Sequence, residues 1–214
     1  ADISKFFYNI DHDILKDIVE YFIGDKDVYW LCEKTIDSTE GLGLPLGNQI
    51  SQVFALLFLS GLDHFITGEL GIKYYGRYMD DFYLILESRE YAKYCLDVIQ
   101  EFIKTLSLKL NSKTQIIPFK NGVKFCGFHT YVTKNGKIIR KLANDKKRTA
   151  KKKYIKMAKL VKEGKLKPEK FFESYYAWKN HLSHGNCVKL THKMDEHIFN
   201  LTRLKNSPTS KVAG

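Results

Sequence analysis

The stretch YYGRYMDDFYLI, residues 74–85, decides the fold, because it places two adjacent acids between two apolar runs. Residues 74–78 and 82–86 are aromatic and aliphatic, as strands often are, and Met79-Asp80-Asp81 separates them. The pattern predicts a β-hairpin with Asp80 and Asp81 at its turn. Alternation along a strand would point the two carboxylates in different directions. A solvated turn is the alternative for a bare Asp-Asp pair, since Asp is a common turn residue.

A third carboxylate favours a metal-binding site over a solvated turn. Asp2 also ends an apolar, strand-like segment, so two strands could present three carboxylates at one edge of a sheet. Clustered carboxylates repel each other unless cations lie among them, and hard oxygen ligands suit Mg²⁺ or Mn²⁺. Two such ions about 4 Å apart would stabilise the attacking and leaving oxygens of a phosphoryl transfer.

The rest of the chain mixes helical and strand-like patterns, which predicts an α+β fold. Apolar spacing predicts amphipathic helices and one helix buried on nearly all its faces. An Asn135-Gly136 turn suited to a type I′ hairpin joins the last two short strands. The predicted helices cover residues 11–23, 25–36, 48–65 (the buried one) and 90–106, the predicted strands cover residues 115–118, 123–126, 128–133 and 137–140, and helices resume beyond Asp145.

Charge divides the chain into two parts. The net charge is +11, yet residues 134–167 hold fifteen Lys or Arg and two acids, a net of +13, so the remainder sums to about −2. We therefore place a boundary near residue 140, between a near-neutral body and a basic helical region. A strongly basic segment in a soluble chain indicates a polyanionic partner, most often nucleic acid.

The uncharged run of residues 41–62 does not predict a membrane span. It contains Pro45 and several amides, and its apolar part, residues 53–59, is far shorter than the ~20 residues a span needs. We see no basic-then-apolar leader at the start, and the four scattered cysteines form no CxxC pair, which favours a reducing compartment. We expect a soluble, cytoplasmic protein with no membrane partner.

Five segments in order resemble the motifs of prokaryotic reverse transcriptases. YMDD, residues 78–81, resembles motif C, and DISKFFYNIDH, residues 2–12, resembles motif A. The segments at 41–52 (GLGLPLGNQISQ), 111–114 (NSKT) and 125–128 (FCGF) resemble motif B, motif D and the primer-grip motif E. The resemblance implies a polymerase palm over residues 1–140, an antiparallel sheet with packed helices, followed by a small basic helical thumb over residues 141–214.

The resemblance implies an RNA-directed DNA polymerase that adds dNTPs to a DNA primer on an RNA template, using two Mg²⁺ ions, with Mn²⁺ as a substitute. Asp2, Asp80 and Asp81 would be the catalytic metal ligands, with the Ile3 carbonyl as a further oxygen. Lys113 is the candidate to protonate or neutralise the leaving pyrophosphate; an ordinary solvated lysine is the equal alternative. The nucleotide-binding candidates are Lys5, Phe6, Phe7, Leu46, Gly47 and Gln52, and the primer-grip candidates are Phe125, Cys126, Gly127 and Phe128, although the phenylalanines could simply pack in strands.

Three motif positions carry finer expectations. Phe7 falls where the family places the aromatic residue that excludes a ribose 2′-hydroxyl, so it predicts a preference for deoxynucleotides. Leu46 stands where motif B usually has Gln, and Gln52 where it usually has Pro. That form resembles the error-prone enzymes of diversity-generating retroelements, with group II intron and retron enzymes as relatives, and it implies a possible accessory protein of a retroelement.

Residues 146–167 predict a basic helix that binds a phosphate backbone. An apolar stripe of Ala150, Tyr154, Met157, Ala158 and Val161 would pack on the protein and leave the other faces cationic. A merely solvated surface helix is the alternative, but that face would tolerate Glu partners that are nearly absent here. The candidate backbone contacts are Lys146, Lys147, Arg148, Lys151, Lys152, Lys153 and Lys156. Tyr175, Tyr176 and Trp178 fit a helical core better than base stacking, and the histidines form no zinc set.

The chain begins at the motif A resemblance, without the fingers that precede it in the family. We therefore expect a palm-and-thumb fragment of a longer polymerase that binds metal and nucleic acid but polymerises weakly on its own. The alternative is a catalytically incompetent module that binds nucleic acid or a partner and retains the motifs. A homodimer through exposed palm surface is possible.

Overall fold

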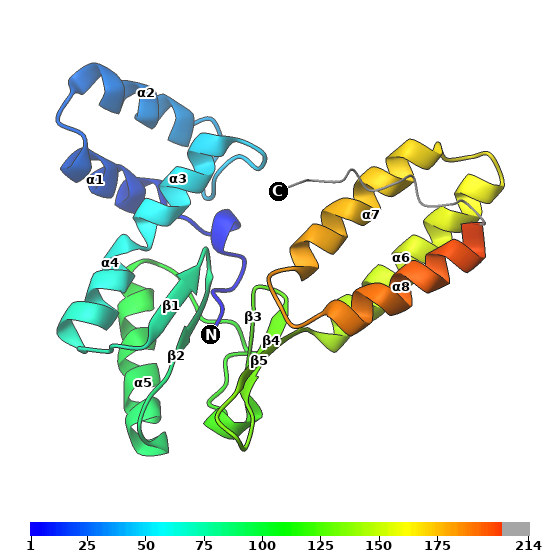
Figure 1. Cartoon of the computed structure of the whole chain (residues 1–214). Coiled ribbons are helices and arrows are strands. Elements are labelled where there is room, and N and C mark those ends of the chain that lie inside the picture. Colours follow the sequence, from blue (N-terminus) through cyan, green and yellow to red (C-terminus); the bar gives the residue numbers. More distant parts are fainter. Residues whose placement is uncertain (203–214) are drawn as a thin grey trace, which may run out of the picture. The chain divides into compact units, whose positions relative to one another are not determined.

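The computed structural model describes residues 1–202, which fall into two compact units (Figure 1). The first unit spans Ala1–Ile117, and the second begins at Pro118. The boundary thus lies earlier than the charge boundary near residue 140. The boundary lies earlier because a small sheet that precedes residue 140 shares a core with the helices that follow it.

Two capped helices follow the start of the first unit. Helix α1 spans His12–Phe22 and α2 spans Lys26–Ile36. Asp11 precedes α1, and its carboxylate accepts hydrogen bonds from two first-turn N–H groups, as the Asp25 carboxylate does before α2. Such caps satisfy backbone donors that have no partner within the helix. The helices predicted over residues 11–23 and 25–36 are confirmed.

The third predicted helix is divided, and it is not buried on all faces. Helix α3 (Gln49–Phe58) and the short α4 (Ser60–His64) continue into a π-helical turn, Phe65–Glu69. Phe54, Ala55 and Phe58 face the core of the unit, whereas exposed apolar side chains cover another face of α3. The prediction of all-round burial was wrong because apolar residues continue onto this exposed face. The exposed set is Ile50, Val53 and Leu56.

The same stretch is the one candidate membrane span in the described part of the chain. Gln49–Glu69 has 21 residues and a mean hydropathy of 1.4, and 39% of the window is buried inside the structure. Length and composition alone would let it cross a membrane. A single such helix is weak evidence, because the core helix of a soluble protein meets the same test.

The hairpin that the acidic stretch predicts is confirmed. Strand β1 (Tyr75–Tyr78) pairs antiparallel with β2 (Asp81–Leu84), and Tyr78 lies opposite Asp81. Met79 and Asp80 therefore form a two-residue loop. Helix α5 (Arg89–Thr105) follows and packs Ile99 and Ile103 into the core that the hairpin shares with α1, α3 and α4.

The second unit opens with a three-stranded antiparallel sheet. A 3₁₀ turn at Phe119–Asn121 leads into β3 (Val123–Phe125), β4 (Phe128–Val132) and β5 (Ile138–Leu142), in that order across the sheet. The strand predicted over residues 115–118 is absent, and Pro118 there has no N–H to donate to a ladder. The β4–β5 loop has three residues rather than two, because the Thr133 N–H donates to the Lys137 carbonyl, with Gly136 at φ +75°.

Three helices complete this unit: α6 (Asn144–Lys162), α7 (Pro168–Leu182) and α8 (Val188–Thr202). They pack together around buried residues that include Tyr154, Phe171 and Tyr175, which confirms the core role expected of Tyr175. A second cluster joins β4 and β5 to the helices through Phe128 and Leu182. The indole of Trp178 packs against both clusters.

Candidate functional site

The three predicted carboxylates belong to neighbouring backbone segments of the first unit. Asp2 forms a bridge with Asp81, and the Ile3 N–H donates to the Asp80 carbonyl at 3.2 Å. The Phe82 N–H donates to the Ala1 carbonyl at 2.9 Å, so the first residues lie along β2 like a short third strand. Segments 78 residues apart in the sequence thus present Asp2 and Asp80 at one edge of the hairpin.

The electrostatics of this edge disfavour negative charge. Burial raises the pKa of Asp80, and the charge of Asp2 raises it further. Burial likewise raises the pKa of Asp81, and the charges of Asp2 and Asp80 add to the shift, against the opposing effect of the Ala1 ammonium. A nearby cation would therefore stabilise the ionised forms of Asp80 and Asp81.

Asn111 holds Asp2 in place from the segment that resembles motif D. Its Nδ2 donates to Asp2 Oδ2 at 2.8 Å, and its backbone N–H donates to the Asp2 carbonyl at 2.7 Å. The neighbouring Ile3 forms a bridge with Leu110. The hydrogen bonds fix one carboxylate oxygen of Asp2 and leave the other available.

A second network holds the turn of the hairpin. Asp63 of α4 accepts from Arg77 Nε at 2.7 Å and from the Tyr75 hydroxyl at 2.6 Å, and its other oxygen pairs with Arg77 Nη2. Arg77 Nη1 donates to the Met79 carbonyl at 3.0 Å. Although burial opposes ionisation, the Arg77 and Tyr75 hydrogen bonds hold the pKa of Asp63 below its usual range. A planar guanidinium thus links α4 to the loop that carries Asp80.

Two non-glycine residues beside the carboxylates adopt the left-handed backbone conformation. Lys5 has φ 49° and Met79 has φ 55°. Such conformations cost on the order of 1–3 kcal/mol and persist only where the surroundings enforce them. At Met79, the Arg77 hydrogen bond to the carbonyl supplies part of that enforcement.

A glycine fastens the loop that resembles motif B to the segment that carries Phe7. Gly43 has φ +87°, its N–H donates to the Ile10 carbonyl at 2.8 Å, and an added Cβ would lie 2.8 Å from the Phe7 carbonyl oxygen. The Leu44 N–H donates to the same oxygen at 2.9 Å. Thr39 Oγ1 donates to the Gly43 carbonyl, and His12 Nε2 lies 2.7 Å from it. This close approach requires a residue without a side chain.

The predicted nucleotide-binding residues separate into exposed and buried groups. Leu46, Gly47, Gln52 and Lys5 are exposed, and Phe7 is half-buried. Phe6 is 1% exposed and packs in the core, with its ring centroid 6.2 Å from that of Phe58. Direct nucleotide contact by the Phe6 side chain was therefore a wrong prediction, because the 3₁₀ turn Phe6–Tyr8 places this ring in the core, whereas Phe7 packs at the margin of the same core. The other five can be reached from solvent.

Lys113 is exposed, and its ammonium forms no ion pair with any residue in the described part of the chain. Its backbone N–H donates to Asn111 Oδ1 at 3.1 Å, so the residue follows directly from the segment that holds Asp2. Its role in neutralising pyrophosphate stays a prediction.

The primer-grip candidates form the β3–β4 turn of the second unit. Phe125 lies opposite Phe128, and the two residues between them, Cys126 and Gly127, have φ 49° and 80°. Positive φ at both central positions is the geometry of a type I′ hairpin. Phe128 is 1% exposed beneath the Arg140 guanidinium, which lies 4.6 Å from its ring centroid. Strand packing, the alternative noted for this residue, thus accounts for its side chain.

The basic face of α6 is as the sequence predicts. Ala150, Tyr154 and Ala158 are buried, and Met157 and Val161 pack half-buried against the same cluster. All seven predicted backbone contacts are exposed. Lys153 donates to Ser174 Oγ at 3.0 Å, so this ammonium is anchored beside α7. The members of the set are Lys146, Lys147, Arg148, Lys151, Lys152, Lys153 and Lys156.

The carboxylate edge offers the oxygen donors that a divalent cation prefers, but its side chains are not arranged around one cation position. Its donors are hard oxygens in a field of like charge. Among residues 1–202, however, no three His, Cys, Asp or Glu side chains converge on one ion position. A cation here would have to be completed by backbone carbonyls such as that of Ile3, or by its substrate.

Comparison with known families agrees with the geometry of this edge. The family described as reverse transcriptase (RNA-dependent DNA polymerase) matches residues 1–130, more than half of the chain. The chain therefore belongs to the reverse transcriptase family, which the motifs predicted. Membership indicates reverse transcriptase or nucleotidyltransferase activity and the binding of a nucleic-acid template and primer. No curated protein matches the sequence.

Proposed function

We propose that the first unit carries the catalytic centre of an RNA-directed DNA polymerase that extends a DNA primer on an RNA template. The observation that carries the proposal is the backbone pairing that brings Asp2 beside Asp80 and Asp81 at one hairpin edge, where burial and like charge raise the pKa of two of them. Repulsion of this kind costs stability, and binding of cations, which also attract substrate phosphates, would offset that cost.

Asp2, Asp80, Asp81 and the Ile3 carbonyl would hold two Mg²⁺ ions. When bound, these ions supply charge stabilisation to the attacking and leaving oxygens of a phosphoryl transfer. In the proposed reaction the primer 3′-hydroxyl gives its proton to solvent water and its oxygen bonds to the α-phosphorus of a dNTP, while the bond between the α-phosphorus and the oxygen that bridges to the β-phosphorus breaks and pyrophosphate leaves. Lys113 neutralises or protonates that pyrophosphate.

The remaining residues of the first unit would orient the substrates. Phe7 forms a flat apolar wall that leaves a ribose 2′-hydroxyl unpaired and so favours deoxynucleotides. Gly43 keeps the exposed loop with Leu46 and Gly47 against the Phe7 backbone. Leu46 cannot hydrogen-bond a nucleotide, which supports weak geometric control and the resemblance to diversity-generating retroelements. An accessory protein of such an element is part of the same proposal.

The helical part of the second unit, from residue 141 on, would act as the thumb. The exposed basic face of α6 binds the phosphate backbone of the template-primer duplex and positions it without reading sequence. The palm and thumb roles, with their division near residue 140, and a soluble, cytoplasmic enzyme belong to this proposal.

A second candidate is a module that binds nucleic acid or a partner without turnover. It is favoured by one observation, that the described residues hold no three metal-ligating side chains around one point.

Primer extension with dNTPs on an RNA template separates the two candidates. It should be run on this chain and on the full-length polypeptide that its gene encodes, each with an Asp80→Ala variant. Extension that requires Asp80 supports the enzyme. Inactivity of the full-length polypeptide under conditions where it binds the duplex would make the module the better account.

Manganese binding gives a readout that does not depend on turnover. Electron paramagnetic resonance of Mn²⁺ should report binding to the chain that is lost in Asp80→Ala. The matched control is Asp97→Asn, which removes an exposed carboxylate of α5, outside the hairpin.

A further inference from the structure

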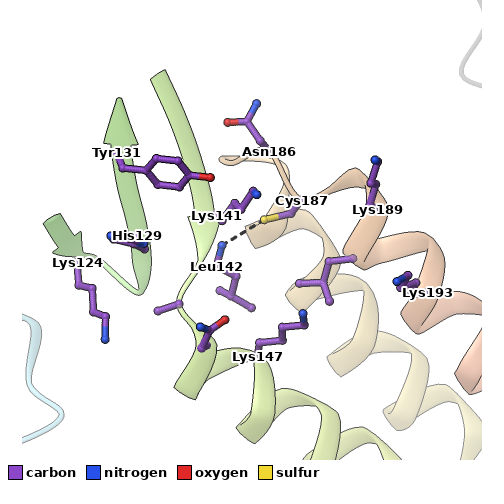
Figure 2. Close-up of a pocket in the computed structure, with 13 residues that line it drawn as sticks. Lys124, His129, Tyr131, Lys141, Leu142, Lys147, Asn186, Cys187, Lys189 and Lys193 are labelled. Atoms are coloured by element: carbon purple, nitrogen blue, oxygen red, sulfur yellow. Dashed lines mark hydrogen bonds between the residues drawn. The ribbon is translucent and has the colours of Figure 1, made fainter. Parts of the chain in front are cut away.

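A cavity of about 450 Å³ lies wholly within the second unit (Figure 2). Strands β4 and β5 form one side of it, and the first turns of α6 and α8 form the other. Its volume lies within the ~300–1,000 Å³ typical of small-molecule sites. Nothing in the proposed polymerase mechanism uses this cavity.

The lining of the cavity is strongly cationic. Five lysines line it, and the lining contains no aspartate or glutamate. None of the five forms an ion pair within residues 1–202. Lys189 and Lys193 lie four residues apart, on the same face of α8. The five are Lys124, Lys141, Lys147, Lys189 and Lys193.

Uncompensated ammonium groups around one concavity raise the local potential and attract an anion. A surface that served only solubility would intersperse acids among the lysines. The arrangement is therefore suited to a ligand with several negative charges, such as a phosphate ester.

One side of the cavity offers flat rings. Tyr131 and His129 are two residues apart on β4, so their side chains share a face of the sheet. Their ring centroids lie 5.3 Å apart with the planes inclined at 34°, and both residues are half-buried. The Lys141 ammonium lies 5.9 Å from the Tyr131 ring. A planar base could stack on this wall beside a cation.

The floor of the cavity is apolar and fixed. Leu142, Ala143 and Cys187 are at most 7% exposed, and the Leu142 N–H donates to Cys187 Sγ at 3.4 Å (Figure 2). Helix α6 begins directly after Ala143 and has no side-chain cap, so its first-turn N–H groups add to the positive field. The aromatic wall and the cationic rim match the base and the phosphate of a nucleotide, and Asn144 and Asn186 in the lining offer polar groups to its sugar.

We propose that this cavity is a nucleotide-binding site, separate from the catalytic edge, that holds phosphate through its lysines and a base against Tyr131. The ligand is a free nucleotide or the 5′-terminal nucleotide of a single strand. Lys147 belongs also to the α6 backbone-contact set, but the other four lysines do not. The site does not depend on polymerase activity.

Isothermal titration calorimetry of this chain with two lysine-pair variants tests the location of the site. The variant Lys189→Glu/Lys193→Glu changes the cavity, and Lys167→Glu/Lys170→Glu makes the same charge change on exposed positions at the start of α7, outside both the cavity and the α6 backbone-contact set. We expect ATP affinity, or that of a 5′-phosphorylated single-stranded oligoribonucleotide, to fall about tenfold or more in the first variant and less than about twofold in the second. Equal losses in both variants would overturn the site, because they would indicate general attraction to positive charge.

Two further ligands, the strand without its 5′-phosphate and inorganic phosphate, separate the sources, and two Tyr131 variants test the stacking wall. ATP binding identifies a free nucleotide as the ligand, whereas binding of only the phosphorylated strand, with loss on removing its 5′-phosphate, identifies a strand end. Tyr131→Leu should weaken nucleotide binding several-fold, and Tyr131→Phe should not. Inorganic phosphate that binds as tightly as both nucleotide ligands, or failure of all of them to bind, would refute a nucleotide site. Thermal denaturation of each variant checks that it is folded.

Discussion

The two units of this protein handle charge in opposite ways. In the first unit, functional charges are held one by one: Asn111 fixes Asp2, and Asp63 fixes Arg77. In the second, the lysines of α6 and of the cavity are exposed, and those of the cavity have no acidic partner among the described residues. The difference fits the two proposed roles. Catalysis of phosphoryl transfer requires carboxylates in fixed positions, whereas attraction of a polyanion requires mainly a high density of positive charge.

The largest effect should follow removal of a carboxylate from the hairpin. Asp80→Ala in the full-length polypeptide should reduce the primer-extension rate by about 10³-fold or more, because stabilisation of the reacting oxygens is worth several kcal/mol. Single-turnover extension at saturating Mg²⁺ measures it. Asp97→Asn should leave the rate unchanged. A similar loss of rate in both variants would show that the carboxylates of the hairpin have no special role.

The next effect concerns the pair that holds the turn. Arg77→Met should destabilise the chain by about 2 kcal/mol, because it leaves the half-buried Asp63 carboxylate without its bidentate partner. Urea denaturation gives the stability. The variant should also lower kcat more than it raises KM for dNTP, since the loop with Asp80 loses a fixed carbonyl; an unchanged kcat would limit Arg77 to folding.

The same pair predicts a pH dependence. The pKa of Asp63 lies below its ordinary value of 3.8, so its ionised form stabilises the folded state above that pH, and this contribution is lost as the pH falls through the lowered pKa. Asp63→Asn should therefore be less stable than the parent chain at pH 7, with a difference that shrinks below about pH 3.8. A constant difference from pH 7 to pH 2.5 would show that ionisation of Asp63 contributes nothing.

In the second unit, the affinity for a nucleic-acid duplex should depend on the number of lysines on α6 and on the salt concentration. Lys152→Glu/Lys156→Glu should weaken binding of a template-primer duplex by about tenfold at low salt and reduce the slope of log affinity against log salt by about 2, since each lost phosphate contact contributes ~0.9. Filter binding from 50 to 200 mM salt measures both. Conservative replacement of both lysines by Arg should leave the slope unchanged, and an unaltered slope in the Glu variant would exclude this face of α6.

The smallest effect compares two glycines with the same backbone angle. Gly43 and Gly47 both have φ +87°, but an added Cβ meets the Phe7 carbonyl at 2.8 Å in the first and nothing within 4 Å in the second. Gly47→Ala should cost only the backbone strain, about 1 kcal/mol, and Gly43→Ala about 1 kcal/mol more. Equal decreases in the free energy of unfolding of the two variants, measured by urea denaturation, would mean that the loop moves away from the Phe7 carbonyl without loss of stability.

The sequence predicted the elements whose signals are local. Alternating apolar runs around Asp80 and Asp81 specified the hairpin, and Asp11 and Asp25 marked helix starts. The apolar stripe of α6 was equally legible, because its positions repeat at the helical period. Family motifs then placed Asp2 beside the hairpin, which spacing alone could not do.

The contacts that hold the site could not be predicted, because they join distant positions. Asn111 meets Asp2 across 109 residues, and nothing in NSKT indicates which residue its amide contacts. Arg77 gave a weak signal as a single cation inside a strand, but its partner Asp63 lies on a helix whose exposure was itself misjudged. Lysines of the cavity come from β3, β5, α6 and α8, so only the folded unit gathers them.

The packing of Trp178 between two clusters gives the protein an intrinsic optical probe. The chain has two tryptophans, and they fall one in each unit: Trp30 on α2 is 56% exposed, whereas Trp178 is half-buried in the second unit. A Trp30→Phe variant therefore emits from the second unit alone, and Trp178→Phe from the first. Their fluorescence would show whether the first and second units unfold together or separately, without any attached dye.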